Sequence, residues 1–170
     1  KGVVKQLNKS QEPLVLAGNE PTIGLYRKAN SYPNIVSEHI AGNPDDLKID
    51  DLRERAWEIL EPRFNDKRRK VAERFEDMQG PGLSSSKLRE IVLAAWQGRI
   101  DSLIFSRQAE QWGTFEGVSN EVHFHEGIEP GDEELINVAA VYTLSNSGDV
   151  YAVEPDEVPG VAEVAAIFRY

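Results

Sequence analysis

Two histidines and a glutamate alternate within one short segment of the chain, at Glu121, His123 and His125. In an extended strand, side chains two positions apart emerge on the same face, so these three could hold a metal ion. The same alternation is typical of a surface strand that turns Val122 and Phe124 toward a core and its polar residues toward water. We favour the surface strand, assign no metal site, and keep a small metal-dependent hydrolase as an alternative function.

Other catalytic patterns find no support in the sequence. Serine hydrolysis needs a histidine, a carboxylate and a strained turn, and the sequence has no Gly-x-Ser-x-Gly. The hydroxyls of Ser84 or Ser85 are better placed to cap a helix that follows them. Residues 80–82 read Gly-Pro-Gly, which is typical of a linker and not of a phosphate-binding loop. We therefore predict no enzyme, no cofactor and no small-molecule substrate.

Basic side chains concentrate in residues 62–74, where the spacing predicts a helix. Cations three and four positions apart share one helix face and could lie along a phosphate backbone, giving a weak rRNA contact. Asp66, Glu73 and Asp77 offset their charge, so a solvated neutral helix is the alternative. The candidates for RNA contact are Arg63, Lys67, Lys70 and Arg74.

The net charge of -10 is distributed unevenly. Residues 1–80 hold equal numbers of basic and acidic side chains, whereas residues 81–170 hold five basic and 15 acidic ones. Phosphate contacts require cations, so the second half is poorly suited to nucleic acid and better suited to a basic protein surface, although a solubilising surface is the simpler interpretation. The candidates for protein docking are Glu133, Glu134, Asp156 and Glu157.

The first half of the chain has strand and helix patterns. A short apolar run at 14–17, bounded by Pro13 and Gly18, predicts a strand, and we expect a helix over 22–28 and a second strand over 34–40. Residues 50–78 have a helical period that Pro62 should kink or restart.

The second half alternates helices and strands after a break at 79–82, which we take as a domain boundary. We expect 83–170 to fold by itself as a small sheet flanked by helices, so the fold class is α/β. The expected elements are a helix that Ser84 or Ser85 begins and Gly98 ends, a strand at 100–105, a hairpin of 111–115 and 121–125, a helix from Asp132 to Leu144, and strands at 150–153 and 164–168.

Composition predicts a cytoplasmic protein with no membrane segment. The chain has no cysteine, which excludes disulfides and thiolate metal sites and favours a reducing compartment. No apolar run approaches the roughly 20 residues that cross a bilayer, and the start lacks a signal-peptide pattern. Val3, Val4 and Leu7 stand at helical spacing, so we interpret the chain as a piece of a longer protein that begins inside a helix.

Four segments, taken in order, resemble a known family. They are PLVLAG at 13–18, LREIVLAAWQGRIDSLIF at 88–105, SGDVYAVEP at 147–155 and AAIFRY at 165–170. Together they resemble the C-terminal half of the archaeo-eukaryotic class I peptide-chain release factor and its Pelota-like relatives, and most closely their bacterial branch. No single segment is diagnostic, so the resemblance depends on order and spacing.

The resemblance implies a fold and a role. It implies that 1–49 are the tail of a ribonuclease-H-like domain, that 50–82 form a long bent crossover helix and linker, and that 83–170 form a three-layer α/β/α sandwich similar to the kink-turn RNA-binding ribosomal-protein fold. The family's Gly-Gly-Gln loop is absent from the sequence, so no catalytic residue is carried over. The implied role is docking to the ribosome or a translational GTPase during release, rescue or hibernation; a stand-alone RNA-binding module is the alternative.

Overall fold

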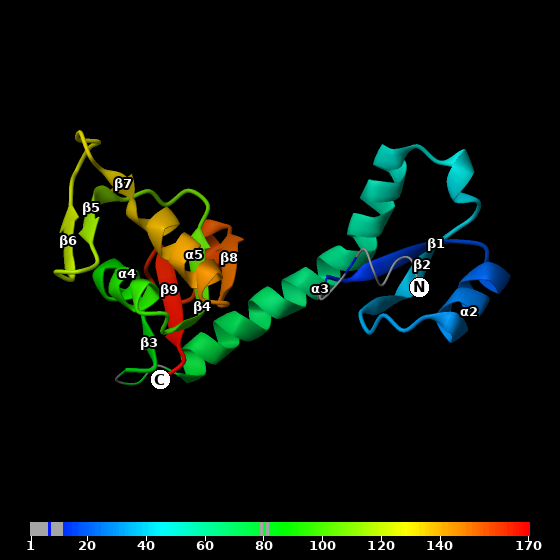
Figure 1. Ribbon diagram of the computed structural model, residues 1–170, viewed down its shortest axis with the longest axis horizontal. Coiled ribbons are helices and arrows are strands. Elements are labelled where there is room, and N and C mark those ends of the chain that lie inside the picture. Colours follow the sequence, from blue (N-terminus) through cyan, green and yellow to red (C-terminus); the bar gives the residue numbers. More distant parts are fainter. Residues whose placement is uncertain (1–6, 8–11, 79, 81) are drawn as a thin grey trace. The chain divides into compact units, whose positions relative to one another are not determined.

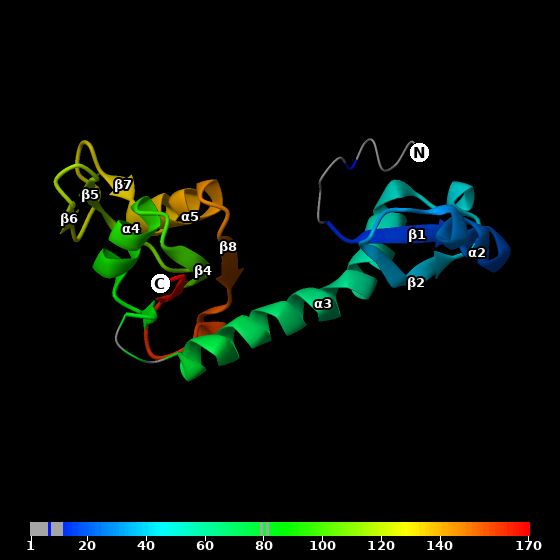
Figure 2. The same cartoon turned by 60° about the horizontal axis from the view of Figure 1, so that its bottom comes forward.

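The computed structural model describes residues 7, 12–78, 80 and 82–170. The chain forms two compact units, 1–67 and 68–170, which we describe separately (Figure 1 and Figure 2). The helical start predicted from Val3 and Val4 lies outside the described residues.

The first unit contains a pair of parallel strands, β1 (Leu14–Gly18) and β2 (Ile35–Ala41). The helix α2 (Glu20–Ala29) connects them, and the side chain of Asn19 caps it by accepting a hydrogen bond from the Thr22 N–H at 3.0 Å. A short 3-10 helix, η1 (Pro44–Asp46), follows β2. The predicted strand, helix and strand are confirmed.

The helix α3 (Ile49–Asp77) runs from the first unit into the second and contains Pro62. Proline removes the hydrogen bond to the carbonyl of Glu58, one turn earlier. Both Glu58 and Pro62 are exposed, so water can reach the freed carbonyl. The prediction left a kink or a restart open, and the restart near Glu61 is wrong, because one helix continues through Pro62.

A four-stranded sheet forms the centre of the second unit. Its strands are β3 (Ser84–Ser85), β4 (Ile100–Ser106), β8 (Asp149–Val153) and β9 (Val164–Phe168), in the order β3-β9-β4-β8. β4 runs parallel to β8 and antiparallel to β9. The three longer strands were predicted. β3 was not, because Ser84 and Ser85 were interpreted as the start of a helix.

A second, three-stranded sheet contains the predicted hairpin. Its strands are β5 (Trp112–Glu116), β6 (Glu121–Phe124) and β7 (Glu133–Glu134), in the order β6-β5-β7. Gly113 is required at the β5–β6 pair because a Cβ atom there would lie 1.9 Å from the carbonyl oxygen of His123. The hairpin is confirmed, and β7 is an element that the sequence interpretation missed.

Two helices of this unit begin later than predicted. The helix α4 (Leu88–Trp96) begins after Lys87, whose N–H donates to Ser85 Oγ at 3.1 Å, so neither serine is the N-cap residue. The helix α5 (Leu135–Ser145) begins after Glu134 and not at Asp132. The residues before each helix pair as β3 and β7, and this pairing delays the helix starts.

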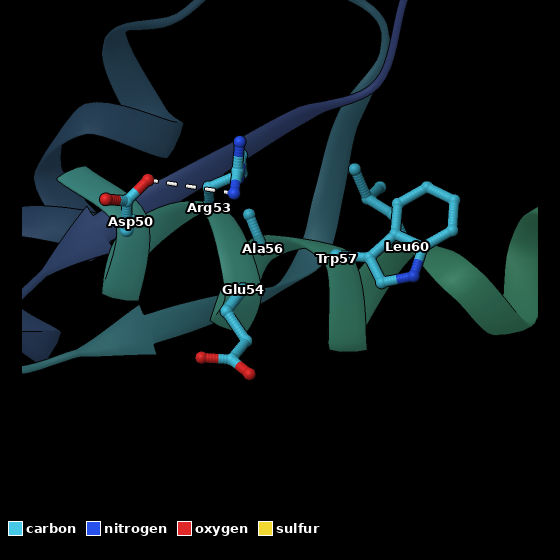
Figure 3. A pocket seen from close by; sticks show the side chains of 6 residues that line it. All are labelled: Asp50, Arg53, Glu54, Ala56, Trp57 and Leu60. Atoms are coloured by element: carbon cyan, nitrogen blue, oxygen red, sulfur yellow. Dashed lines mark ion pairs between the residues drawn. The ribbon is translucent and has the colours of Figure 1, made fainter.

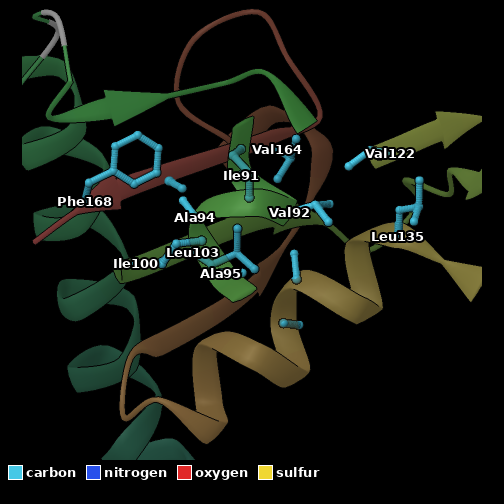
Figure 4. Close-up of a cluster of buried hydrophobic side chains, with 13 residues drawn as sticks. Ile91, Val92, Ala94, Ala95, Ile100, Leu103, Val122, Leu135, Val164 and Phe168 are labelled. Atoms are coloured by element: carbon cyan, nitrogen blue, oxygen red, sulfur yellow. The ribbon is translucent and has the colours of Figure 1, made fainter. Parts of the chain in front are cut away.

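Apolar residues lie on both faces of the four-stranded sheet. One cluster joins α4 and α5 to the sheet (Figure 4); its largest fully buried members are Ile91, Val92, Ile100, Leu103, Val122 and Leu135. A second cluster places Phe75 of α3 among residues of the sheet and of the segment after β8. Its buried members are Phe75, Ile104, Val153, Val158, Ala165 and Ile167. The last turns of α3 therefore pack as part of this unit.

Gly148 lies in the turn between α5 and β8, where there is no room for a side chain. A Cβ atom at this position would lie 2.7 Å from Thr143 Cγ2 and 2.8 Å from the carbonyl oxygen of Ile100. A larger residue would push α5 away from the start of β4. None of the helices in the described residues has both the length and the apolar character that crossing a membrane requires.

Candidate functional site

The four cations proposed for RNA contact have different surroundings. Arg63 and Lys67 belong to the first unit, and Lys70 and Arg74 to the second. Arg74 Nη2 lies 2.7 Å from Asp101 Oδ2, with side chains 44% and 38% exposed. Ser102 Oγ donates to the same carboxylate oxygen at 2.9 Å. Arg74 therefore fixes α3 to β4, and a phosphate would have to compete with Asp101 for it.

Arg63 also acts on a carboxylate of its own unit. The hydroxyl of Ser37 donates to Glu38 Oε2 at 2.6 Å, and this bond, with smaller help from the charge of Arg63, lowers the pKa of Glu38. The sequence interpretation missed Arg68, whose side chain is 22% exposed and whose Nη1 lies 3.6 Å from Glu157 Oε2. Arg69 Nε also lies 3.9 Å from Glu73 Oε1, so three arginines within residues 68–74 contact carboxylates of the second unit.

The four carboxylates proposed for docking divide into two kinds. Glu134 caps α5 by accepting from the N–H groups of Ile136 at 3.1 Å and Asn137 at 2.5 Å. Glu157 accepts from the Glu154 N–H at 3.0 Å. These two side chains stabilise helix starts, because they accept hydrogen bonds from backbone N–H groups that have no partner within the helix. Glu133 and Asp156 are exposed and offer negative charge to solvent.

The histidines near the hairpin do not form one group. His123 Nε2 lies 3.9 Å from Glu121 Oε2, and both side chains are exposed. His125 Nδ1 instead lies 2.8 Å from Asp132 Oδ1, a carboxylate with 0% of its side chain exposed. Within the described residues, no three histidines or carboxylates stand together in a way that could hold a metal ion.

Each basic side chain within 82–170 has a partner inside the unit, which the sequence pattern did not reveal. Lys87 Nζ lies 2.9 Å from Glu90 Oε1. The remaining contacts are Arg89 over the Phe124 ring, Arg99 to the Tyr170 carbonyl, Arg107 to the Ala152 carbonyl and Arg169 to the Asn146 carbonyl. Glu90 lies only three residues after Lys87, but the other four partners lie far away in sequence, so no local pattern could have identified them. None of these five cations is therefore free to contact the phosphate of a nucleic acid.

An open groove of about 580 Å³ lies along the first turns of α3 (Figure 3). Its lining residues all belong to this helix: Asp50, Arg53, Glu54, Ala56, Trp57 and Leu60. Trp57 is 49% exposed and stacks on Phe64, with ring centroids 5.7 Å apart. Near the other end of α3, Phe75 and the partly buried Val71 pack in the cluster on the four-stranded sheet.

Comparison with known proteins identifies the family. The family model named bacterial archaeo-eukaryotic release factor family 3 matches residues 1–99. The chain belongs to this family. The resemblance drawn from the sequence is thereby confirmed.

The similarity of this family 3 chain to solved structures continues beyond residue 99, where the family match ends. It is similar to an archaeal Pelota in a model of ribosome-bound Pelota and ABCE1, with 16% identity and a TM-score of 0.59, covering 99% of this chain and 46% of that one. A second similar structure is Pelota from Archaeoglobus fulgidus, with 15% identity and a TM-score of 0.45, covering 99% and 53%. The chain thus spans about half of the proteins it matches, and its fold is Pelota-like. Comparison with curated proteins gives no match.

Proposed function

We propose that this family 3 chain is the non-catalytic docking half of a translation-associated factor that acts in release, rescue or hibernation of ribosomes. The observation that carries the proposal is the family membership over residues 1–99 together with a Pelota-like fold along 99% of the chain. The ribosome-bound state of the archaeal Pelota makes the ribosome the first partner to test. A translational GTPase, which the sequence resemblance implies, is the second. A cytoplasmic location follows from this role.

The finer domain assignment belongs to the same proposal. We assign 1–49 to the tail of a ribonuclease-H-like domain, 50–82 to a bent crossover helix and linker, and 83–170 to a three-layer sandwich of the kink-turn RNA-binding type. Helices that pack on both faces of the four-stranded sheet support the sandwich. The packing of Phe75 argues that the sandwich also needs the end of α3.

Ribosome binding tests the proposal directly. The purified chain should cosediment with 70S ribosomes at low salt, and sedimentation no greater than that of an unrelated acidic protein of the same size would overturn it. The Arg63→Gln, Lys67→Gln, Lys70→Gln triple variant should flatten the salt dependence, because each lost phosphate contact removes about 0.7–0.9 from the log–log slope. A matched control removes three cations elsewhere, with Lys48→Gln, Arg53→Gln and Arg55→Gln. An equal slope in both variants would remove the RNA contact.

The alternative functions make different predictions. A stand-alone RNA-binding module should bind a kink-turn RNA without ribosomes, which the partnered cations of the second unit disfavour. A metal-dependent hydrolase at Glu121, His123 and His125 should bind Zn²⁺ in a calorimetric titration. We expect neither, and we also expect no peptidyl-tRNA hydrolysis by this chain, since it contains no Gly-Gly-Gln.

A further inference from the structure

The helix α5 presents apolar side chains to solvent. Its sequence, LINVAAVYTLS, contains no charged residue, although charged residues make up 28% of the chain. One side of the helix is buried through Leu135, Ile136, Ala139, Ala140 and Thr143. On the other side, Val141 is 51% exposed and Leu144 is 60% exposed. Asn137 and Ser145 are the polar residues that share this exposed side. A surface helix normally turns charged and polar residues to water, so two large exposed apolar side chains on a helix without any charge indicate a covered surface.

An aromatic side chain from α4 extends this apolar surface. The ring of Trp96, which is 41% exposed, packs edge-on against the ring of Tyr142, with centroids 5.0 Å apart. Val138 lies one helical turn before both Val141 and Tyr142, so it joins the two parts. We call the surface of Trp96, Val138, Val141, Tyr142 and Leu144 the α5 face. Contiguous apolar residues of this kind mark interaction sites, whereas single exposed ones are normal.

Exposed carboxylates lie around the α5 face. Glu133 lies two residues before the helix begins, and Asp149 lies four residues after it ends. Glu116 is next to Gly117, whose added Cβ would lie 2.5 Å from the ring of Trp96. The cation near the end of α5, Arg169, donates to the carbonyls of Asn146 and Gly98. An apolar centre with an acidic rim repels phosphates and also repels a second copy of the same surface.

We propose that the α5 face docks onto a basic protein of the ribosome, one whose contact surface has an apolar centre and a rim of lysine or arginine. This inference rests on the proposed function and assigns its protein contact to particular side chains. Burial of Val141, Leu144 and Trp96 supplies affinity, and the carboxylates steer the approach and exclude RNA.

Charge insertion tests the α5 face. Val141→Glu and Leu144→Glu should each weaken cosedimentation with 70S ribosomes at least tenfold. Val161→Glu and Ile128→Glu add the same charge at side chains that are 109% and 70% exposed, and should change it less than twofold. Circular dichroism melts should be unchanged in all four variants, since the substituted side chains face solvent.

The outcomes separate the two proposals. A wild-type chain that does not cosediment overturns the proposed function and this inference with it. A wild-type chain that binds, with Val141→Glu and Leu144→Glu binding as well as the controls, overturns the inference alone. A photocrosslinking phenylalanine at position 144 should attach to a ribosomal protein; attachment to rRNA, to a second copy of the chain or to an added translational GTPase would overturn the assignment of the partner.

Discussion

Replacement of Phe75 by alanine should destabilise the second unit strongly. The Phe75 side chain is 4% exposed and packs in the cluster on one face of the four-stranded sheet. Truncation of a buried phenylalanine to alanine costs about 3–5 kcal/mol, because the lost transfer free energy adds to the cost of the cavity. Whole domains are stable by only about 5–15 kcal/mol. The variant should therefore lose at least about a fifth, and up to all, of the stability of this unit.

Urea unfolding measures the loss. In a Trp57→Phe background, the fluorescence of Trp96 and Trp112 reports on the second unit alone. With a slope of about 1–2 kcal/mol per molar urea, the midpoint should fall by about 1.5–5 M. Phe64→Ala is the matched control on the same helix, because its side chain is 36% exposed and lies in the first unit, and it should not shift this midpoint.

The same packing changes the expectation for isolated fragments. The sequence alone predicts that 83–170 folds by itself, but that fragment lacks Phe75. We expect 68–170 to unfold at a higher urea concentration than 83–170. A midpoint shift below about 0.5 M for Phe75→Ala, or equal stability of the two fragments, would refute this reasoning.

Three further predictions concern the hairpin and two titrating groups. Gly113→Ala should disrupt the β5–β6 pair, seen as faster amide exchange in β6, whereas Gly127→Ala, with nothing within 4 Å of the added Cβ, should not. Hydrogen bonds from Ser85 and Lys87 lower the pKa of Glu90. The Glu90 carboxylate therefore stabilises the fold at pH values above the usual carboxyl pKa, and this contribution is lost as pH falls. Ser85→Ala should raise the pKa of Glu90, measured by ¹³C NMR titration. Burial, with the nearby Asp149, raises the pKa of Tyr151, so the contribution of its neutral hydroxyl to folding stability is lost as pH rises. An absorbance titration should show that Tyr151 ionises at a higher pH than free tyrosine does. Ionisation at the pH of free tyrosine would contradict the burial.

Local patterns predicted the longer elements of the fold. The apolar run 14–17 is too short for a helix between Pro13 and Gly18, so it predicts a strand. The alternation of polar and apolar residues around Val122 predicts a strand of the hairpin. The short strands β3 and β7 escaped prediction because their partners, Ile167 and Trp112, lie far away in sequence. No window of neighbouring residues contains that information.

The candidate surfaces were less predictable than the elements. Charge patterns identified Arg74 and Glu134 as available for partners, but each is engaged inside the protein, with Asp101 and the start of α5 respectively. Conversely, α5 contains no charged residue, and only the structure reveals which of its apolar side chains remain exposed. Spacing predicts which residues share a helix face, but it does not predict what another segment places against that face.

Gly148 bears on how this fold can diverge during evolution. The family model matches residues 1–99, and the identity to the ribosome-bound archaeal Pelota is 16%, so a pairwise sequence alignment over the second unit has few identical residues that fix which positions correspond. Steric exclusion of any Cβ atom at this turn supplies a fixed point that does not depend on overall similarity. Lineages that keep α5 packed against β4 must keep glycine here, and Ser147 before it has a φ of 60°, so that position favours residues that tolerate the left-handed region. An alignment of distant relatives can therefore be anchored on this glycine.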